Sequence, residues 1–155
     1  MISSTTPDDG AFRSLRLEDQ LCFALYAASR AMTALYRPLL SELGITYPQF
    51  LVLILLWERN PRTVREIDDA LRLDYGTVSP LLKRLEAAGL VRRERRPEDE
   101  RSVNVVLTEA GEAVRERAVD IRSCVACAAD LPPEDFAALR ATLAELTSAL
   151  AAAEA

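Results

Sequence analysis

The chain has 155 residues, of which half are hydrophobic and 6% are aromatic, and its formal net charge is −5. Its three cysteines and its lack of histidine exclude Ser-His and Cys-His catalysis and every zinc site with a histidine ligand. The odd cysteine count argues against a disulfide framework, and we expect no cofactor and no metal. Alanine, leucine, arginine and glutamate dominate the composition, which favours helices over sheets.

The first 14 residues (1–14) form a polar, turn-rich segment that we expect to be flexible. This segment has no basic stretch followed by an apolar core, so it is not a secretory signal. No apolar run in the sequence approaches the ~20 residues of a membrane span. These features predict a cytoplasmic protein with no membrane partner.

Two helices are expected next. Apolar residues recur at intervals of three and four from Leu17 to Leu43, which predicts one long helix that stops at Gly44. A second helix, from Tyr47 to about Arg59, is apolar nearly all round, so we expect it at the centre of the fold.

A helix-turn-helix follows these two helices. Thr63 is expected to cap a short helix, with Glu66 as its partner in a capping box. The residues that this helix is expected to bury are Val64, Ile67, Ala70 and Leu71. The next helix is expected to begin near Thr77, because Pro80 lacks an amide donor, and to end at Gly89. The side chains expected on its inner face are Val78, Leu81, Leu82 and Leu85.

Two strands, 90–95 and 102–107, with a charged hairpin tip at 96–101, complete a winged helix order. A further helix is expected from Thr108 to about Ala128, and a last amphipathic helix from Pro133 to about Ala152. The predicted fold class is mainly α with a small β-hairpin. It comprises a winged helix-turn-helix domain at 47–108, flanked by helical dimerisation regions at 15–46 and 109–155.

The positive charge is concentrated in one stretch. Between Lys83 and Arg96, six cationic side chains and two carboxylates give a local balance of +4, so the rest of the chain carries −9. A basic stretch on an acidic frame suits contact with a polyanion in one place, and a solvated charged surface is the alternative. In a winged helix, the second helix enters the major groove of double-stranded DNA and the hairpin reaches the minor groove or the phosphates. The candidate DNA-binding residues are Tyr75, Thr77, Ser79, Lys83, Arg84, Arg95, Arg96, Asp99 and Arg101.

A single recognition helix reads few base pairs, and such domains usually dimerise on two half-sites ~34 Å apart. We therefore expect a homodimer on an inverted-repeat operator, with the flanking helices as the dimerisation material. A winged helix that binds protein, or that only builds a core, is the alternative.

The residue pattern alone does not decide the roles of the three cysteines. Cys22 fits either a reactive thiol near a helix N-terminus or a small buried hydrophobe. Cys124 and Cys127 share one helical face, and without histidine they cannot complete a four-ligand zinc site within one chain. A three-thiolate site for a soft metalloid across a dimer stays open. Of the pair, Cys124 is expected to be a core residue.

Several motifs together resemble one known family. They are LEDQLCFALY at Leu17–Tyr26, Tyr36, ITYPQ at Ile45–Gln49, LLKRLEAAGLV at Leu81–Val91 and DERS at Asp99–Ser102. On these motifs the chain resembles the MarR family of transcription regulators and, within it, the organic hydroperoxide-sensing OhrR subgroup of two-cysteine type.

The resemblance implies a homodimeric repressor that releases its operator when an organic hydroperoxide oxidises Cys22. A second cysteine of the partner subunit then resolves the sulfenic acid as an intersubunit disulfide, and we favour Cys127 over Cys124 for that role. The residues that the resemblance implies as hydrogen-bond donors to the thiolate are Tyr36 and Tyr47, with Tyr26 nearby in sequence.

Two other functions remain as alternatives. One is a MarR-type repressor that is released by a small phenolic or other non-redox ligand. The other is a thiol peroxidase, but the sequence offers no second catalytic group beside the cysteines, so we expect that the protein is not an enzyme.

Overall fold

The computed structural model describes residues 14–73, 75–96 and 99–153, except for the side chains of residues 75, 96 and 99–101. The chain divides into two compact units. We call residues 32–125 the central unit. Residues 14–31 and 126–153 form the terminal unit.

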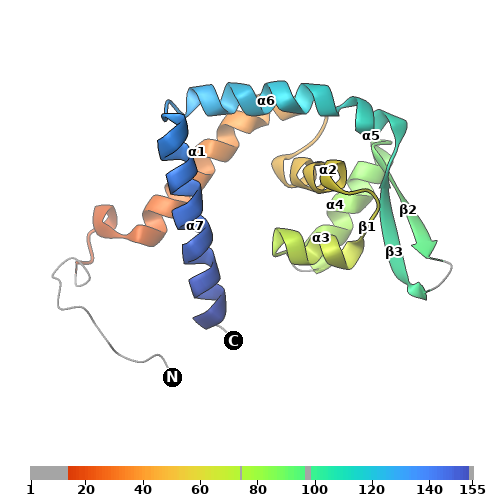
Figure 1. The fold of residues 1–155 in the computed structure, drawn as a ribbon, viewed down its shortest axis with the longest axis horizontal. Coiled ribbons are helices and arrows are strands. Elements are labelled where there is room, and N and C mark those ends of the chain that lie inside the picture. Colours follow the sequence, from red (N-terminus) through yellow and green to blue (C-terminus); the bar gives the residue numbers. More distant parts are fainter. Residues whose placement is uncertain (1–13, 74, 97–98, 154–155) are drawn as a thin grey trace. The chain divides into compact units, whose positions relative to one another are not determined.

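The central unit has the winged helix order that the sequence predicts (Figure 1). It contains the end of α1 (Leu21–Ser41), α2 (Tyr47–Glu58), β1 (Arg62–Thr63), α3 (Val64–Leu71) and α4 (Tyr75–Ala87). These are followed by β2 (Val91–Arg96), β3 (Asp99–Leu107), α5 (Glu109–Ala113) and most of α6 (Arg115–Ala128). The three strands form one antiparallel sheet in the order β1-β3-β2, so β2 is an edge strand. The fold class, mainly helical with a small sheet, is confirmed.

The core of the central unit surrounds α2, as its apolar sequence predicts. Phe50, Val52, Leu53 and Leu56 of this helix are all buried. The short helix α3 buries Ile67 and half-buries Val64 and Leu71, but Ala70 is exposed, so the prediction for Ala70 is wrong. The core-facing side of α4 is as predicted: the buried residues are Val78, Leu81, Leu82 and Leu85.

Glycine ends two helices of the central unit where the sequence predicts. Gly44 and Gly89 have φ values of +67° and +72°, in the left-handed region that favours glycine. After α4, the Leu90 amide donates to the Leu85 carbonyl and the Gly89 amide donates to the Glu86 carbonyl. These two bonds form a Schellman motif, which sets the direction in which the chain leaves α4.

Some boundaries differ from the sequence prediction. A 3₁₀ turn, η2 (Leu17–Asp19), precedes α1, which begins only at Leu21. Helix α4 begins at Tyr75 rather than near Thr77, since Pro80 removes only the single bond to the carbonyl four residues before it. The helix expected from Thr108 to Ala128 is divided into α5 and α6 at Val114.

The sheet also exceeds the prediction. The two residues of β1, expected as a turn and a helix cap, pair with Val105 and Asn104 of β3. The hairpin is longer than expected, because Arg96 pairs with Asp99 within the predicted tip. Residues 97–98 of that tip lie outside the described part of the chain.

The terminal unit contains η2, the first half of α1, the end of α6 and α7 (Pro133–Ala153). None of its described residues is buried. Several large apolar side chains are exposed on it: Leu15, Leu17, Leu21, Phe23, Tyr26, Leu131, Phe136, Leu139 and Leu150. Contrary to the expectation from apolar runs, α7 is long and apolar enough to cross a membrane by length and composition alone. Alanine supplies much of its hydropathy, and Arg140 and Glu145 interrupt it.

Candidate nucleic-acid interface and redox site

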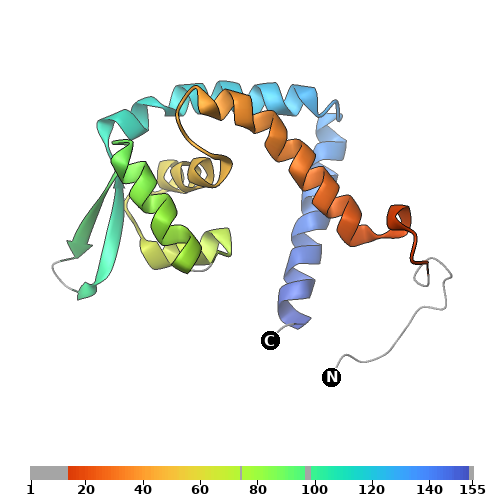
Figure 2. The same cartoon turned by 180° about the vertical axis from the view of Figure 1, so that it is seen from behind.

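Helix α4, the green helix beside the wing in the view of Figure 2, carries polar residues on the side away from its buried stripe. Thr77, Lys83 and Arg84 are exposed on this face, and Ser79 is half-buried. Within the described part of the chain, Lys83 and Arg84 make no ion pair. Both charges therefore remain available to a polyanion such as the DNA backbone.

Two of the wing arginines are already paired with carboxylates. Arg92 donates from Nε to Glu94 Oε1 at 2.5 Å, within the same strand. Arg93 pairs with Glu86 of α4 instead. Arg95 is exposed and has no carboxylate partner among the residues that the structure describes. These two ion pairs use both carboxylates of the stretch, so its balance of +4 is carried by Lys83, Arg84 and Arg95 together with Arg96, whose side chain lies outside the described part of the structure.

The contact between Glu86 and Arg93 is the most extensive ion pair of this region. Nε and Nη2 of Arg93 donate to Glu86 Oε2 at 2.9 and 2.7 Å, and the Arg93 amide donates to Oε1 at 3.1 Å. The hydrogen bonds from the Arg93 side chain and backbone hold the pKa of Glu86 below its usual value. The pair joins the last turn of α4 to β2.

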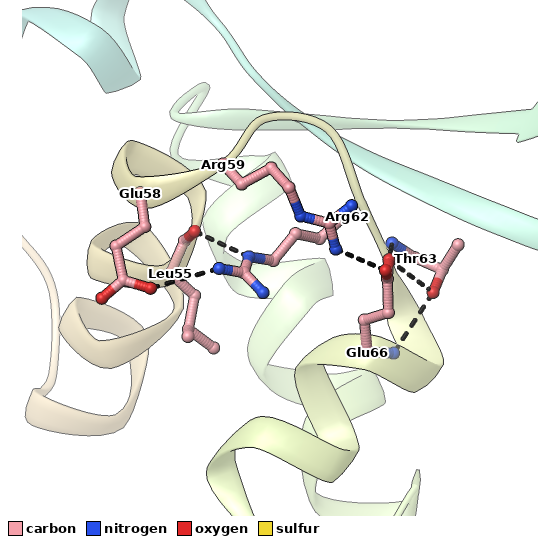
Figure 3. A network of polar contacts seen from close by, with 6 residues as sticks. All are labelled: Leu55, Glu58, Arg59, Arg62, Thr63 and Glu66. Atoms are coloured by element: carbon pink, nitrogen blue, oxygen red, sulfur yellow. Dashed lines mark hydrogen bonds and ion pairs between the residues drawn. The ribbon is translucent and has the colours of Figure 1, made fainter.

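A second polar network fixes the start of the helix-turn-helix (Figure 3). Arg62 of β1 donates from Nε to the Leu55 carbonyl at 2.8 Å and from Nη2 to Glu58 at 3.1 Å, which ties β1 to the end of α2. The predicted capping box is confirmed: the Thr63 amide donates to Glu66 at 2.7 Å and the Glu66 amide donates to Thr63 Oγ1 at 3.2 Å.

Glu66 also binds the Arg59 guanidinium, so one carboxylate serves both the cap of α3 and the turn before it. The Thr63 amide, followed by the side chains of Arg59 and Thr63, lowers the pKa of Glu66 to about 2. The network thereby holds the start of α3 against the end of α2. Helix α3 in turn packs against α4, which follows it in the helix-turn-helix.

Four of the predicted DNA-binding side chains lie outside the described part of the structure: those of Tyr75, Arg96, Asp99 and Arg101. Their backbone positions are described. Residue 75 is the first of α4, and the other three lie in β2 and β3 of the wing. Their contacts with DNA stay predictions.

Cys22 is the second residue of α1 and its side chain is exposed. In the single chain, Cys22 is therefore not a buried hydrophobe. Tyr26, one turn later, accepts a hydrogen bond from Arg30 Nη1 at 2.9 Å, which leaves its own hydroxyl hydrogen available for donation.

Tyr36 and Tyr47 lie together in the central unit, with ring centroids 4.8 Å apart. Burial raises the pKa of both hydroxyls, and for Tyr36 the neighbouring Tyr47 raises it further while Arg122 acts in the opposite direction. Both groups thus stay protonated at neutral pH and can donate a hydrogen bond to an anion. Cys22 belongs to the terminal unit, so its pairing with these tyrosines stays a prediction.

Cys124 and Cys127 are both exposed on α6. The expectation of Cys124 as a core residue is wrong, because α6 buries the stripe formed by Ala118, Ile121 and Val125, and Cys124 lies beside it. Both thiols are therefore accessible in the chain, and the choice of a resolving cysteine is not decided by burial.

Sequence reasoning missed Glu86, Arg93 and Arg62 as residues that organise the interface. An arginine and a carboxylate separated by seven residues are not neighbours on a helix, so their pairing depends on the turn between α4 and β2. The sequence signal that was available is the glutamate in the last turn of α4 together with the glycine stop that follows it.

Comparisons with known proteins agree with this architecture. The MarR family model matches residues 45–103. The organic hydroperoxide resistance transcriptional regulator of Bacillus subtilis is 47% identical over 142 residues, which cover 92% of this chain and 97% of that protein. The regulator MgrA of Staphylococcus aureus is 40% identical over 134 residues, covering 86% of this chain and 91% of that protein.

Among solved structures, AbfR, a protein of Staphylococcus epidermidis, is similar in more than one redox state. Reduced AbfR bound to DNA superposes with a TM-score of 0.79 at 37% identity, covering 91% of this chain and 96% of AbfR. Disulfide-formed AbfR has a TM-score of 0.64 at 39% identity, covering 88% of this chain and 96% of AbfR. The match to a DNA-bound regulator over nearly the whole chain, together with the curated relatives, shows a regulator and not an enzyme. The chain belongs to the MarR family of DNA-binding transcriptional regulators.

Proposed function

We propose that this regulator is a homodimeric repressor that senses organic hydroperoxides at Cys22 and leaves its operator when that thiol is oxidised. The observation that carries the proposal is the exposed Cys22 thiol in the first turn of α1, in a chain 47% identical to an organic hydroperoxide resistance regulator. A cytoplasmic location follows from the DNA partner.

The proposed sensing step is a two-electron oxidation of the thiolate. The Cys22 sulfur attacks the terminal peroxide oxygen, an S–O bond forms, the O–O bond breaks, and the organic fragment leaves as an alcohol after taking a proton. The product is a sulfenic acid. Tyr36 and Tyr47, which burial keeps protonated, are the proposed donors to the thiolate, with Tyr26 as a third. The apolar neighbours Leu21 and Phe23 suit an organic peroxide.

The sulfenic acid is then resolved by a second cysteine. A thiolate, proposed to be Cys127 of the partner subunit, attacks the Cys22 sulfur, an S–S bond forms, and the hydroxyl leaves as water. Disulfide formation requires Cα atoms within about 7 Å and sulfurs at about 2.05 Å. If reduced cysteines lie farther apart, the bond displaces the helices that carry them, and with them the two DNA-binding units.

The proposed DNA contacts follow from the exposed polar face of α4 and from the wing. Lys83 and Arg84 neutralise phosphates, while Thr77 and Ser79 hydrogen-bond phosphates or base edges in the major groove. Arg95 reaches the minor groove or its phosphates from β2. The remaining proposed contacts are Tyr75, Arg96, Asp99 and Arg101.

Homodimerisation is supported by the terminal unit, whose described residues bury no side chain in the single chain. Large apolar side chains such as Phe136, Leu139 and Leu150 of α7 stay 38–58% exposed there, so each forgoes part of the roughly 1.5–3 kcal/mol that full burial of such a side chain contributes. A second copy of the same helices covers such a surface, and the two copies then present two recognition helices to an inverted repeat. The apolar character of α7 fits this interface, so it does not require a membrane.

The test of this proposal compares wild-type protein with Cys22→Ser. Both reduced proteins should bind the same DNA duplex, selected by the wild-type protein from a random-sequence library. Cumene hydroperoxide should release the wild type and leave Cys22→Ser bound, as measured by fluorescence anisotropy. Equal release of the variant would contradict the proposal.

A second candidate function is release by a small aromatic ligand. An open, mainly apolar pocket of about 260 Å³ in the central unit supports it, with Phe50 and Trp57 of α2 facing Arg122 of α6. That lining suits a small aromatic anion. Release from DNA by such a compound after complete thiol alkylation would favour this candidate over oxidation.

A further inference from the structure

The contact between Glu86 and Arg93 connects the two DNA-facing parts of the central unit. Glu86 lies in the last turn of α4 and Arg93 is the third residue of β2. Both carboxylate oxygens of Glu86 accept hydrogen bonds, one from the Arg93 amide and the other from two nitrogens of its guanidinium. The side chains of Arg93 and Glu86 are 32% and 36% exposed, respectively, so the pair is partly shielded from water and salt.

This arrangement restricts the direction of the wing. The Schellman motif at Gly89 fixes the chain where it leaves α4, and the base of the wing is also held by the pairing of β3 with β1 and by the buried side chains of Val91 and Val105. Because β2 is the edge strand, amides on its outer side have no strand partner, and Glu86 accepts one of them. A planar guanidinium and a carboxylate bind in a defined relative orientation, so the pair adds a directional attachment between α4 and β2.

The neighbouring pair of Arg92 and Glu94 lacks this property. Both residues lie in β2, two residues apart, and their side chains are 56% and 48% exposed. Such a pair cannot relate the strand to α4, and a surface pair of this kind contributes little to stability. Like the pair of Arg93 and Glu86, the pair of Arg92 and Glu94 joins an arginine of β2 to a glutamate. Removal of Glu94 therefore provides a matched control for removal of Glu86.

We propose that Glu86 and Arg93 are positioning residues for DNA binding: they hold the wing at the orientation to α4 that lets both reach one duplex together. The proposal rests on the DNA-binding surface proposed above. It assigns Arg93 to Glu86 rather than to a phosphate. It also explains why a carboxylate lies beside a surface that must approach a polyanion.

Removal of Glu86 should change the affinity for DNA in opposite directions, depending on whether the residue acts through its charge alone or by positioning the wing. If charge were all that mattered, Glu86→Ala would remove a negative charge, free Arg93 and strengthen binding to DNA. If the pair positions the wing, the same substitution weakens binding, because the wing then has to be ordered at the moment of binding.

The experiment measures the affinity of reduced, full-length Glu86→Ala and Glu94→Ala for a duplex selected by the wild-type protein. We expect Glu86→Ala to bind about tenfold more weakly, equivalent to about 1.4 kcal/mol, and Glu94→Ala to bind at least as tightly as the wild type. In hydroxyl-radical footprints, Glu86→Ala should lose protection where the wing lies and keep it where α4 lies. Unchanged or tighter binding by Glu86→Ala, or a uniform loss of its footprint, would overturn the proposal.

Three further variants separate this proposal from other outcomes. Arg93→Lys keeps the positive charge but loses the guanidinium fork, so it should show the same selective loss of wing protection; a wild-type footprint would contradict positioning. If Glu86→Ala unfolds, Glu86→Gln, which keeps an acceptor for the amide, replaces it under the same criteria. Lys83→Gln with Arg84→Gln tests the DNA-binding surface itself, since unchanged affinity there would refute that surface independently of Glu86.

Discussion

Two glutamates of the central unit, Glu66 and Glu86, each bind an arginine and a backbone amide at the same time. In both cases the carboxylate lies near a helix end, and in both its pKa is lowered by the hydrogen bonds that it accepts. At the residue scale, these carboxylates connect neighbouring elements of the fold. Their ionised form is the one that does so, and this makes the structure sensitive to acid.

Glu66 gives a direct test of this role. Its pKa is lowered from 4.5 to about 2 in the folded protein, so the ionised group stabilises the fold fully above pH 4.5, and that stabilisation is lost as pH falls towards 2. Glu66→Gln should lower the free energy of unfolding at neutral pH by about 1 kcal/mol or less, because the side chain is 40% exposed and solvent screens it. Denaturant unfolding from pH 7 to pH 3 measures the difference.

The difference between wild type and Glu66→Gln should shrink as the pH falls through this window. Glu116→Gln serves as the control, since Glu116 is exposed on α6 and makes no hydrogen bond to any described residue. A difference that is constant with pH would show that the hydrogen bonds of Glu66 do not depend on its charge.

At the same scale, the sequence allowed the contacts of some side chains to be predicted but not those of others. The Thr63 and Glu66 capping box was predictable, because its geometry is contained within four consecutive residues. Whether each arginine is paired with a carboxylate was not predictable. Arg93 finds its carboxylate only after a helix, a turn and a strand have formed, and this pairing depends on tertiary structure.

At the scale of elements, α6 determines how the second thiol is presented. Its buried stripe at Ala118, Ile121 and Val125 leaves Cys124 and Cys127 exposed. Cys127 lies on the side of α6 opposite this stripe and Cys124 beside it, so the two thiols differ in direction by about 60° around the helix axis. The two thiols therefore point in different directions from α6, which makes the choice between them a matter for experiment.

The choice of resolving cysteine can be measured with single variants. We expect peroxide-treated wild type and Cys124→Ser to migrate as a crosslinked dimer on non-reducing gels, and Cys127→Ser to migrate as a monomer, because the thiol opposite the buried stripe is the proposed partner of Cys22. Crosslinking that persists in Cys127→Ser and disappears in Cys124→Ser would reverse the assignment.

The elements themselves were largely predictable where local signals decide. Gly44 and Gly89 end their helices as expected, and the apolar sequence of α2 places it in the core. The strand β1 was missed because its two residues pair with β3 some forty residues later, and only tertiary contact makes them a strand. The break at Val114 was missed since α5 and α6 have one continuous helical pattern in the sequence.

At the scale of the whole molecule, the proposed sensor and the proposed DNA-binding surface lie in different units. Cys22 and Cys127 belong to the terminal unit, whereas α4 and the wing belong to the central unit. Helices α1 and α6 each run from one unit into the other. Oxidation at Cys22 therefore has continuous helices through which to act, and we propose that in a dimer it changes the spacing of the two recognition helices.

The measurement that tests this coupling most directly is the distance between the two DNA-binding units of the dimer, before and after oxidation. A spin label on an unnatural amino acid replaces the exposed Glu109 of α5, which leaves the native cysteines intact. Double electron–electron resonance should give one distance distribution for reduced protein, with and without DNA. Cumene hydroperoxide should shift that distribution in the wild type and leave it in place in Cys22→Ser. Loss of DNA binding by oxidised wild type with an unchanged distribution would contradict the account.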